Sequence, residues 1–197
     1  VQTCALPISP CSYYPLNAKA ATVQASWRAL APVIPHDLDS SNMPVVFLSV
    51  AVRNPAHTPV HVSFVFNWEN LCGCQRGSAP VDRGGFHPVS CQDDSSEARF
   101  QGLGFGKYEG FQNSSEGNYA LLAQPQADQE ITVLGWNASD PAELDTFWQQ
   151  FHYDGRLGNQ ISRHKTSQCA AVCCTRQLMP QQEGRFLFAL SWYCPRF

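Results

Sequence analysis

Nine cysteines occur in the 197 residues, and two groups of them are spaced closely enough to suggest chemistry. One group is the pair Cys72 and Cys74, and the other comprises Cys169, Cys173 and Cys174. Structural zinc sites usually pair two C-x₂₋₄-C motifs, or one such motif with histidines, and the first spacing here is too short for that. Disulfides stay an alternative, because their pairing cannot be read from a sequence. We therefore expect unpaired, partly buried thiols and no metal site.

Carboxylates on predicted loops and strand ends are the next candidates for chemistry. They are Glu69, Asp82, Asp93, Asp94, Glu97 and Glu109. Cleavage of a glycosidic bond needs two carboxyl groups placed across that bond, one of them held protonated by its surroundings. Glu69 has the most interesting position, because it follows Trp68 at the end of a predicted buried strand. A strand-end glutamate beside an asparagine more often serves a turn, so we expect no catalytic residue in this set.

No nucleophile or nucleotide motif supports another enzymatic reading. The sequence lacks a G-x-S-x-G elbow, a P-loop and an H-E-x-x-H helix. The glycine-rich string at 102–106 lacks the strand-to-helix context of a dinucleotide site, so it predicts a loop or a kinked strand. We expect no bound cofactor. Aromatic residues are mostly core candidates, and Trp136 and Tyr108 are the plausible solvent-facing platforms for a sugar.

Composition limits the class of protein. Thirteen Lys and Arg against sixteen Asp and Glu give a net charge of −3, and 44% of residues are hydrophobic. Such a chain can bury a core, which argues against disorder. The absence of a basic stripe argues against a nucleic-acid partner. No apolar run reaches the roughly 18 residues that would indicate a transmembrane helix.

The elements that would position these residues are mainly strands. Apolar residues alternate from Val60 to Trp68, with Val65 as an interruption, and 45–52 predicts a more fully buried strand. The two-proline turn at 54–59 predicts that these strands form one hairpin. Further strands are predicted at 22–27, 119–123, 131–136 and 186–192, about six in all. We therefore expect a mainly all-β fold, an antiparallel β-sandwich with one or two short helices.

One helix is well indicated after the strand at 131–136. Asp140 can cap it, Pro141 suits its first turn, and Glu143 would complete a capping box. Apolar residues then recur at helical spacing up to Phe151, and the Asp-Gly pair at 154–155 predicts the end. In contrast, the Gly- and Ser-rich stretch from 72 to 117 predicts long loops with one or two strands, either functional or a surface excursion.

The two ends suggest a fragment. Residues 1–9 (VQTCALPIS) look like a translated sequencing adapter, so we expect a scar at 1–9 and a partial domain at 10–197. The compartment cannot be read from such a sequence, with the cytoplasm only slightly favoured.

Several strings occur together in an order typical of one family. They are SWRALAPVIPHD from Ser26, DSSNMPV from Asp39, the strand from Val60 into ENL, GNYAL from Gly117, WQQF from Trp148, DGRL from Asp154 and FALSW from Phe188. Together they resemble the N-terminal domain of the non-lysosomal glucosylceramidase or bile-acid β-glucosidase family, glycoside hydrolase family 116. The resemblance covers about 13–197.

The resemblance implies a two-domain retaining β-glucosidase. Its β-sandwich would precede a helical-barrel catalytic domain that carries the acid and the nucleophile and acts on glucosides, including glucosylceramide. That second domain is absent from these 197 residues, so no catalytic position is carried over. The expected partner is this missing domain, with the substrate bound there. A sandwich of this kind should expose an apolar face where its partner docks. The alternatives are a stand-alone carbohydrate-binding sandwich and a cysteine-linked metal module.

Overall fold

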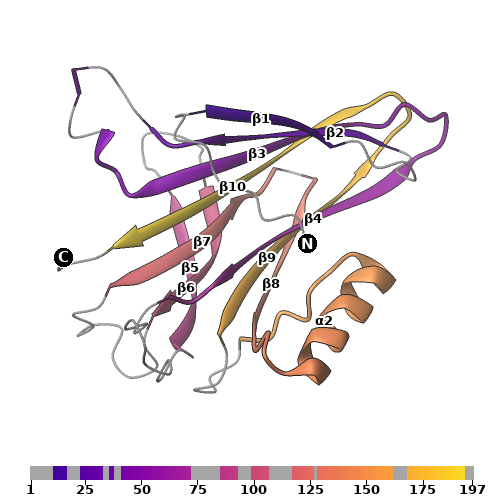
Figure 1. The fold of residues 1–197 in the computed structure, drawn as a ribbon. Helices are drawn as coiled ribbons and strands as arrows, with labels where there is room; N and C mark the ends of the chain where they lie inside the picture. Colours follow the sequence, from indigo (N-terminus) through magenta and orange to yellow (C-terminus); the bar gives the residue numbers. More distant parts are fainter. Residues whose placement is uncertain are drawn as a thin grey trace.

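A computed structural model describes residues 11–16, 23–32, 36–37, 41–71, 85–92, 99–106, 117–126, 128–161 and 168–193, the first of these by backbone alone. They form two antiparallel sheets that pack face to face (Figure 1). The large sheet has the strand order β1-β2-β3-β10-β7-β6-β5, and the small sheet has the order β4-β9-β8. The strands are β1 Cys11–Leu16, β2 Gln24–Leu30, β3 Val45–Arg53, β4 Val60–Glu69, β5 Gly85–Gln92, β6 Arg99–Gly106, β7 Asn118–Gln124, β8 Glu130–Trp136, β9 Cys169–Leu178 and β10 Glu183–Tyr193. The predicted antiparallel β-sandwich is confirmed.

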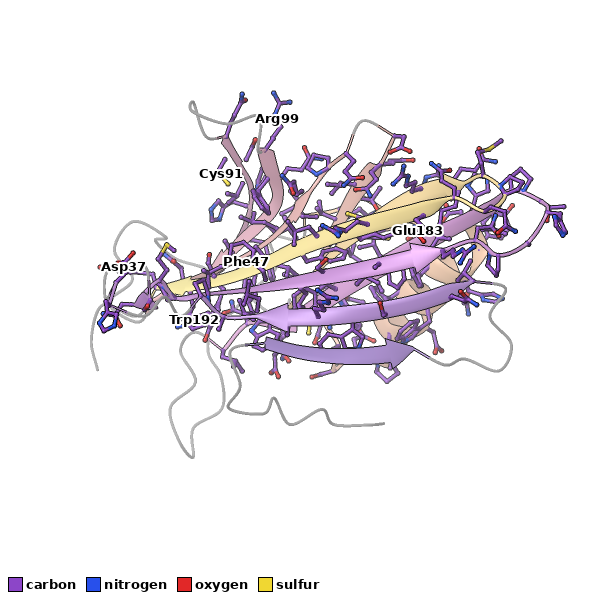
Figure 2. All side chains as sticks on the ribbon, turned by 90° about the horizontal axis from the view of Figure 1, so that it is seen from above. Asp37, Phe47, Cys91, Arg99, Glu183 and Trp192 are labelled. Carbon is purple, nitrogen blue, oxygen red and sulfur yellow. The ribbon has the colours of Figure 1, made fainter. Side chains whose placement is uncertain are left out.

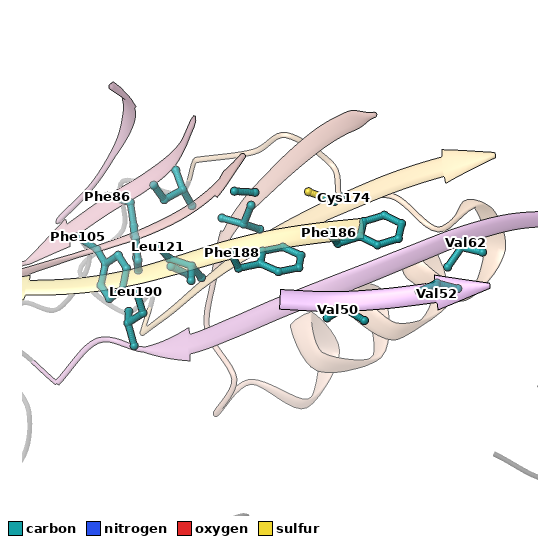
Figure 3. Close-up of a cluster of buried hydrophobic side chains, with 14 of the residues drawn as sticks. Val50, Val52, Val62, Phe86, Phe105, Leu121, Cys174, Phe186, Phe188 and Leu190 are labelled. Atoms are coloured by element: carbon teal, nitrogen blue, oxygen red, sulfur yellow. The ribbon is translucent and has the colours of Figure 1, made fainter. Parts of the chain in front are cut away.

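The core lies between the two sheets, where alternate residues of facing strands meet. Phe64 and Phe66 of β4 contact Phe186 and Phe188 of β10, with ring centroids 4.9 Å and 6.0 Å apart. Figure 3 shows Phe186 and Phe188 within this core. Val65, which interrupts the predicted alternation, points to the opposite side of β4 and packs into a second apolar cluster under a helix. The helix therefore covers β4 around Val65, whereas His61, Asn67 and Glu69 on the same face stay exposed.

Strand β9 was not predicted, because its sequence does not alternate. Its first seven residues, CAAVCCT, are all buried. Ala170, Val172 and Cys174 face the core between the sheets. Cys169, Ala171 and Cys173 face the second cluster instead. A central strand that is covered on both faces does not alternate between apolar and polar residues. The buried run of β9 consists mostly of small residues instead.

The predicted hairpin of 45–52 and 60–68 is wrong. Strand β3 pairs with β2 and β10, whereas β4 pairs with β9 in the other sheet. The intervening turn is a crossover between layers, so the two apolar strands face each other across the core. Asn54 holds this crossover: its amide nitrogen donates to the carbonyl oxygens of Thr58, Leu178 and Met179 at 2.8, 3.2 and 3.1 Å. These bonds tie the turn to the β9–β10 connection.

The predicted helix is confirmed as α2, Pro141–Asp154, which lies against the outer face of the small sheet (Figure 1). The Asp140 carboxylate accepts a hydrogen bond from the Ala142 amide at 2.9 Å, and Gly155 ends the helix in the left-handed region at φ 69°. Glu143 departs from the expected capping box, because its carboxylate accepts from the amide of Asn137 at 2.7 Å.

The glycine- and serine-rich middle of the chain contains strands β5 and β6, in line with the prediction of loops with one or two strands. Residues 102–106 lie within strand β6. Of the two predicted forms, a loop or a kinked strand, the structure therefore shows a strand. Gly102 is required there, because a Cβ at this position would collide with the carbonyl oxygen of Leu121 on β7. Within the part of the chain that the structure describes, no helix combines the length and apolar character that crossing a bilayer requires.

Candidate interdomain surface

The carboxylates singled out in the sequence do not form a site in the described residues. Glu69 is exposed at the end of β4. Asp82, Asp93, Asp94, Glu97 and Glu109 lie outside the described residues. The pairing of two acids across a bond is therefore untested for this set.

The second cysteine cluster is structural in character. Cys173 and Cys174 are buried and carry free thiols, whereas Cys91 is exposed. Burial raises the pKa of the Cys173 thiol to about 11 and that of the Cys174 thiol to about 12. Because β9 alternates, Cys174 points to the core and Cys173 to the helix, so their thiols diverge. The pair Cys72 and Cys74 lies outside the described residues.

Trp136 is not a sugar platform, which corrects the sequence prediction. Its ring is 5% exposed and stacks on Phe147 of α2 at 4.5 Å between centroids. Its indole nitrogen donates to the Asn67 side-chain oxygen at 2.9 Å. The physical reason is the helix, which covers this face of the small sheet. Tyr108, the other predicted platform, lies outside the described residues.

The outer face of the large sheet carries a row of residues in register across six strands. The row runs Leu30, Phe47, Ala189, Leu122, Gly102 and Val89 on β2, β3, β10, β7, β6 and β5. Every member is apolar or glycine. Antiparallel pairing places register partners on the same face, and this face points away from the core. An apolar row on the outer side of a sheet is a feature that sequence alternation alone did not identify.

Two phenylalanines meet above the middle of this face. The rings of Phe47 on β3 and Phe100 on β6 are 6.5 Å apart between centroids, although β10 and β7 lie between their strands. In register with Phe47, Ala189 on β10 and Leu122 on β7 are both buried on this outer face. This contact makes a minor apolar cluster outside the sandwich.

Four exposed apolar side chains lie at one end of neighbouring strands of the large sheet. Their exposed fractions are 46% for Leu30, 49% for Met43, 37% for Trp192 and 59% for Tyr193. The amide of Trp192 donates to the carbonyl oxygen of Pro44 at 3.0 Å, which joins the end of β10 to the residues before β3. Figure 2 shows Phe47 and Trp192 at this end and Glu183 at the other. We call Leu30, Met43, Trp192 and Tyr193 the end patch.

One polar group on this face, His87, is partly withdrawn from water. His87 of β5 lies over Gly104 of β6, where a Cβ would come within 2.5 Å of the imidazole. Burial lowers the pKa of His87 below its ordinary value of 6.5.

The end patch offers exposed apolar surface to another molecule. No three His, Cys, Asp or Glu side chains of the described ranges gather as metal ligands would. Exposed aromatic and aliphatic groups at the end of a rigid sheet can bury apolar area against another protein surface, which is the main favourable term in association.

The fold places the protein among the antiparallel β-sandwich domains, with an apolar row and the end patch on its large sheet. Comparison with known families matches residues 5–197 to "beta-glucosidase 2, glycosyl-hydrolase family 116 N-term". Because the match covers almost the entire chain, the protein belongs to this family of glycoside hydrolase N-terminal domains. The resemblance drawn from the sequence is thereby confirmed. Membership in such a family implies a catalytic domain as partner.

Proposed function

We propose that this protein serves as the non-catalytic accessory domain of a retaining β-glucosidase. It would pack on a helical catalytic domain and help to shape it. The observation that carries the proposal is the end patch. Four large apolar side chains at one end of β2, β3 and β10 would cost free energy in water. Family membership supports the direction of the inference, because an N-terminal domain of a glycosidase has a catalytic neighbour.

The substrates of the assembled enzyme would be β-glucosides, glucosylceramide among them, bound and cleaved by the neighbour. In a retaining enzyme the nucleophilic and acid carboxyl groups are about 5–5.5 Å apart, and both belong to the partner in this proposal. The sandwich contributes by fixing the partner's position. Burial of the end patch and of the adjoining Phe47 supplies the attraction, and the rigidity of β10 supplies the orientation.

The proposal is tested by combining this chain with the catalytic domain encoded by the same gene. The catalytic domain alone should hydrolyse 4-methylumbelliferyl β-D-glucoside poorly, and addition of this chain should raise the rate. The double variant Met43→Ser/Tyr193→Ser should require at least tenfold more of the chain for half of that effect. Met179→Ser, which changes an exposed methionine at the β9–β10 turn, is the matched control. Turnover by this chain alone would contradict the proposal.

A stand-alone carbohydrate-binding module is the second candidate. Of the two platforms that the sequence offered for it, Trp136 is removed by its burial, and Tyr108 lies outside the described residues. Trp148, an exposed aromatic side chain on α2, offers this domain a different platform for a sugar.

A further inference from the structure

The groove between the end of α2 and the start of β4 has no role in the proposed interdomain contact. It measures about 720 Å³ and is lined by His61, Ser63, Trp148, Phe151, His152, Tyr153, Asp154, Gly155 and Arg156. This volume lies within the range of small-molecule sites. In Figure 1, α2 lies on one side of the molecule and the end of β10 on the other, so the groove is separate from the end patch.

Trp148 is the lining residue that most clearly indicates a ligand. It is 54% exposed, although its neighbour Phe147 is 3% exposed. The indole is nevertheless held in place: it meets the Phe147 ring edge-on at 5.0 Å and 85°, and the Phe151 ring at 6.4 Å and 71°. An exposed aromatic plane that is already ordered loses little conformational freedom when a ligand covers it.

The floor of the groove is a hydrogen-bonded network that fixes helix to strand. The Thr175 hydroxyl donates to the carbonyl oxygen of Gly155 at 2.8 Å. Since a threonine hydroxyl has one hydrogen, Ser63 is the donor in the 3.0 Å bond between the Ser63 and Thr175 oxygens. Gly155 cannot carry a side chain, because a Cβ would collide with Ser63. The relative position of α2 and β4 is therefore rigid.

The rim of the groove offers polar groups around the aromatic plane. His61 and His152 are exposed, and Tyr153 is almost fully exposed. One oxygen of Asp154 accepts from the Arg156 amide at 2.9 Å, which leaves the other oxygen as an acceptor. The rim thus presents donors and acceptors, and the plane beneath it is apolar.

This combination matches one ligand chemistry. A β-glucoside ring carries its hydroxyls around the edge and its axial C–H groups on both faces, so one face can lie on an indole while the edge forms hydrogen bonds. Protein docking is less well matched, because polar and ionisable side chains make up more than half of the lining. An aromatic body with polar neighbours suits a ligand of mixed character.

We propose that the groove formed by Trp148, His61, His152 and Asp154 binds a β-linked glucoside, as a surface site separate from the catalytic centre. Trp148 is the stacking platform, Asp154 accepts from ring hydroxyls, and the two histidines contact further hydroxyls. The site would hold a glucoside near the enzyme without cleaving it. It does not depend on the end patch, so the two proposals stand or fall separately.

The test is a titration of this chain with cellotriose, followed by the indole N–H resonances in an NMR spectrum. The sequence has five tryptophans, which act as internal controls for one another. We expect a saturable shift of the Trp148 signal, with a dissociation constant in the millimolar range, and unmoved signals from the buried Trp136 and from Trp192 of the end patch. A saturable shift confined to another tryptophan, or no shift at tens of millimolar cellotriose, would overturn the proposal.

Variants separate stacking from an indirect effect on the fold. Trp148→Ala should raise the dissociation constant at least tenfold, about 1.4 kcal/mol, while Trp148→Phe should retain most of the binding. His152→Ala should weaken binding severalfold. Met179→Ala, a change of equal exposure far from the groove along the chain, should leave binding unchanged. Equal weakening by Trp148→Ala and Met179→Ala would refute the assignment. Maltotriose should bind more weakly, and binding tighter than that of cellotriose would also refute it.

Discussion

Trp136 of β8 and Phe147 of α2 stack with their ring planes 8° apart and their centroids separated by 4.5 Å. This contact joins the helix to the small sheet and closes the second apolar cluster. It also explains why Trp136 is unavailable to a ligand. The helix is therefore an integral layer of the domain rather than an appendage to it.

Loss of this stack should destabilise the domain strongly. Phe147→Ala removes a nearly fully buried ring and leaves a cavity, so the free energy of unfolding should fall by about 3–5 kcal/mol. The neighbouring change Trp148→Ala removes an exposed ring and should cost about 1 kcal/mol or less. Urea denaturation followed by circular dichroism measures both. Equal losses for the two variants would contradict the observed packing of α2.

The Asn54 amide should be a second point of high sensitivity. Asn54→Ala leaves the carbonyl oxygens of Thr58, Leu178 and Met179 without this donor, and the free energy of unfolding should fall by about 3 kcal/mol. Asn137→Ala is the matched control, because Asn137 accepts a single hydrogen bond from Ser139 in an exposed turn. That variant should lose about 0.5 kcal/mol. A small effect of Asn54→Ala in the same urea titration would count against its role in joining the β3–β4 crossover to the β9–β10 connection.

His87 should make stability depend on pH. Its pKa is lowered by burial from 6.5 in the folded state, so just below pH 6.5 the unfolded chain binds a proton that the folded chain does not. The free energy of unfolding should therefore fall as the pH drops below about 6.5. His87→Gln should show a smaller fall between pH 6.5 and pH 5 than the natural chain. Parallel pH profiles for the two proteins would show that His87 is not responsible.

The cysteines should differ sharply in reactivity. The thiolate is the reactive form, and burial raises the pKa of Cys173 to about 11 and that of Cys174 to about 12. At pH 8, N-ethylmaleimide should label the exposed Cys91 in the native protein and should label Cys173 and Cys174 only after unfolding in urea. Peptide mass spectrometry identifies each site. Rapid native labelling of Cys173 would contradict a buried, structural role.

Much of the fold could be predicted where one face of an element is exposed. The alternation from Val60 to Trp68 reflects such one-sided burial, and the cap at Asp140 is a local signal that depends on backbone amides rather than on burial. Strand β9 could not be predicted in this way, because both of its faces are covered. Its three cysteines instead suggested a chemical site. The crossover after Arg53 was taken for a hairpin, because a short two-proline turn does not reveal whether it joins strands within a layer or between layers.

The candidate surfaces were less accessible to sequence reasoning. The row from Leu30 to Val89 depends on register across six strands, which is a long-range property. Trp148 was placed with the helix's apolar stripe by its spacing, yet it lies at the edge of that stripe and faces solvent. An exposed apolar face on the domain was expected from the family resemblance, and its position required the structure.

The most direct test of the accessory-domain role is hydroxyl-radical footprinting of two samples. One is this chain alone, and the other is the same chain within the protein that also contains the catalytic domain. Oxidation is read at Met43, Trp192 and Tyr193, with Met179 as the internal reference. We predict that the three side chains of the end patch lose most of their oxidation in the larger protein, while Met179 is unchanged. Equal oxidation of the end patch in both samples would contradict the account.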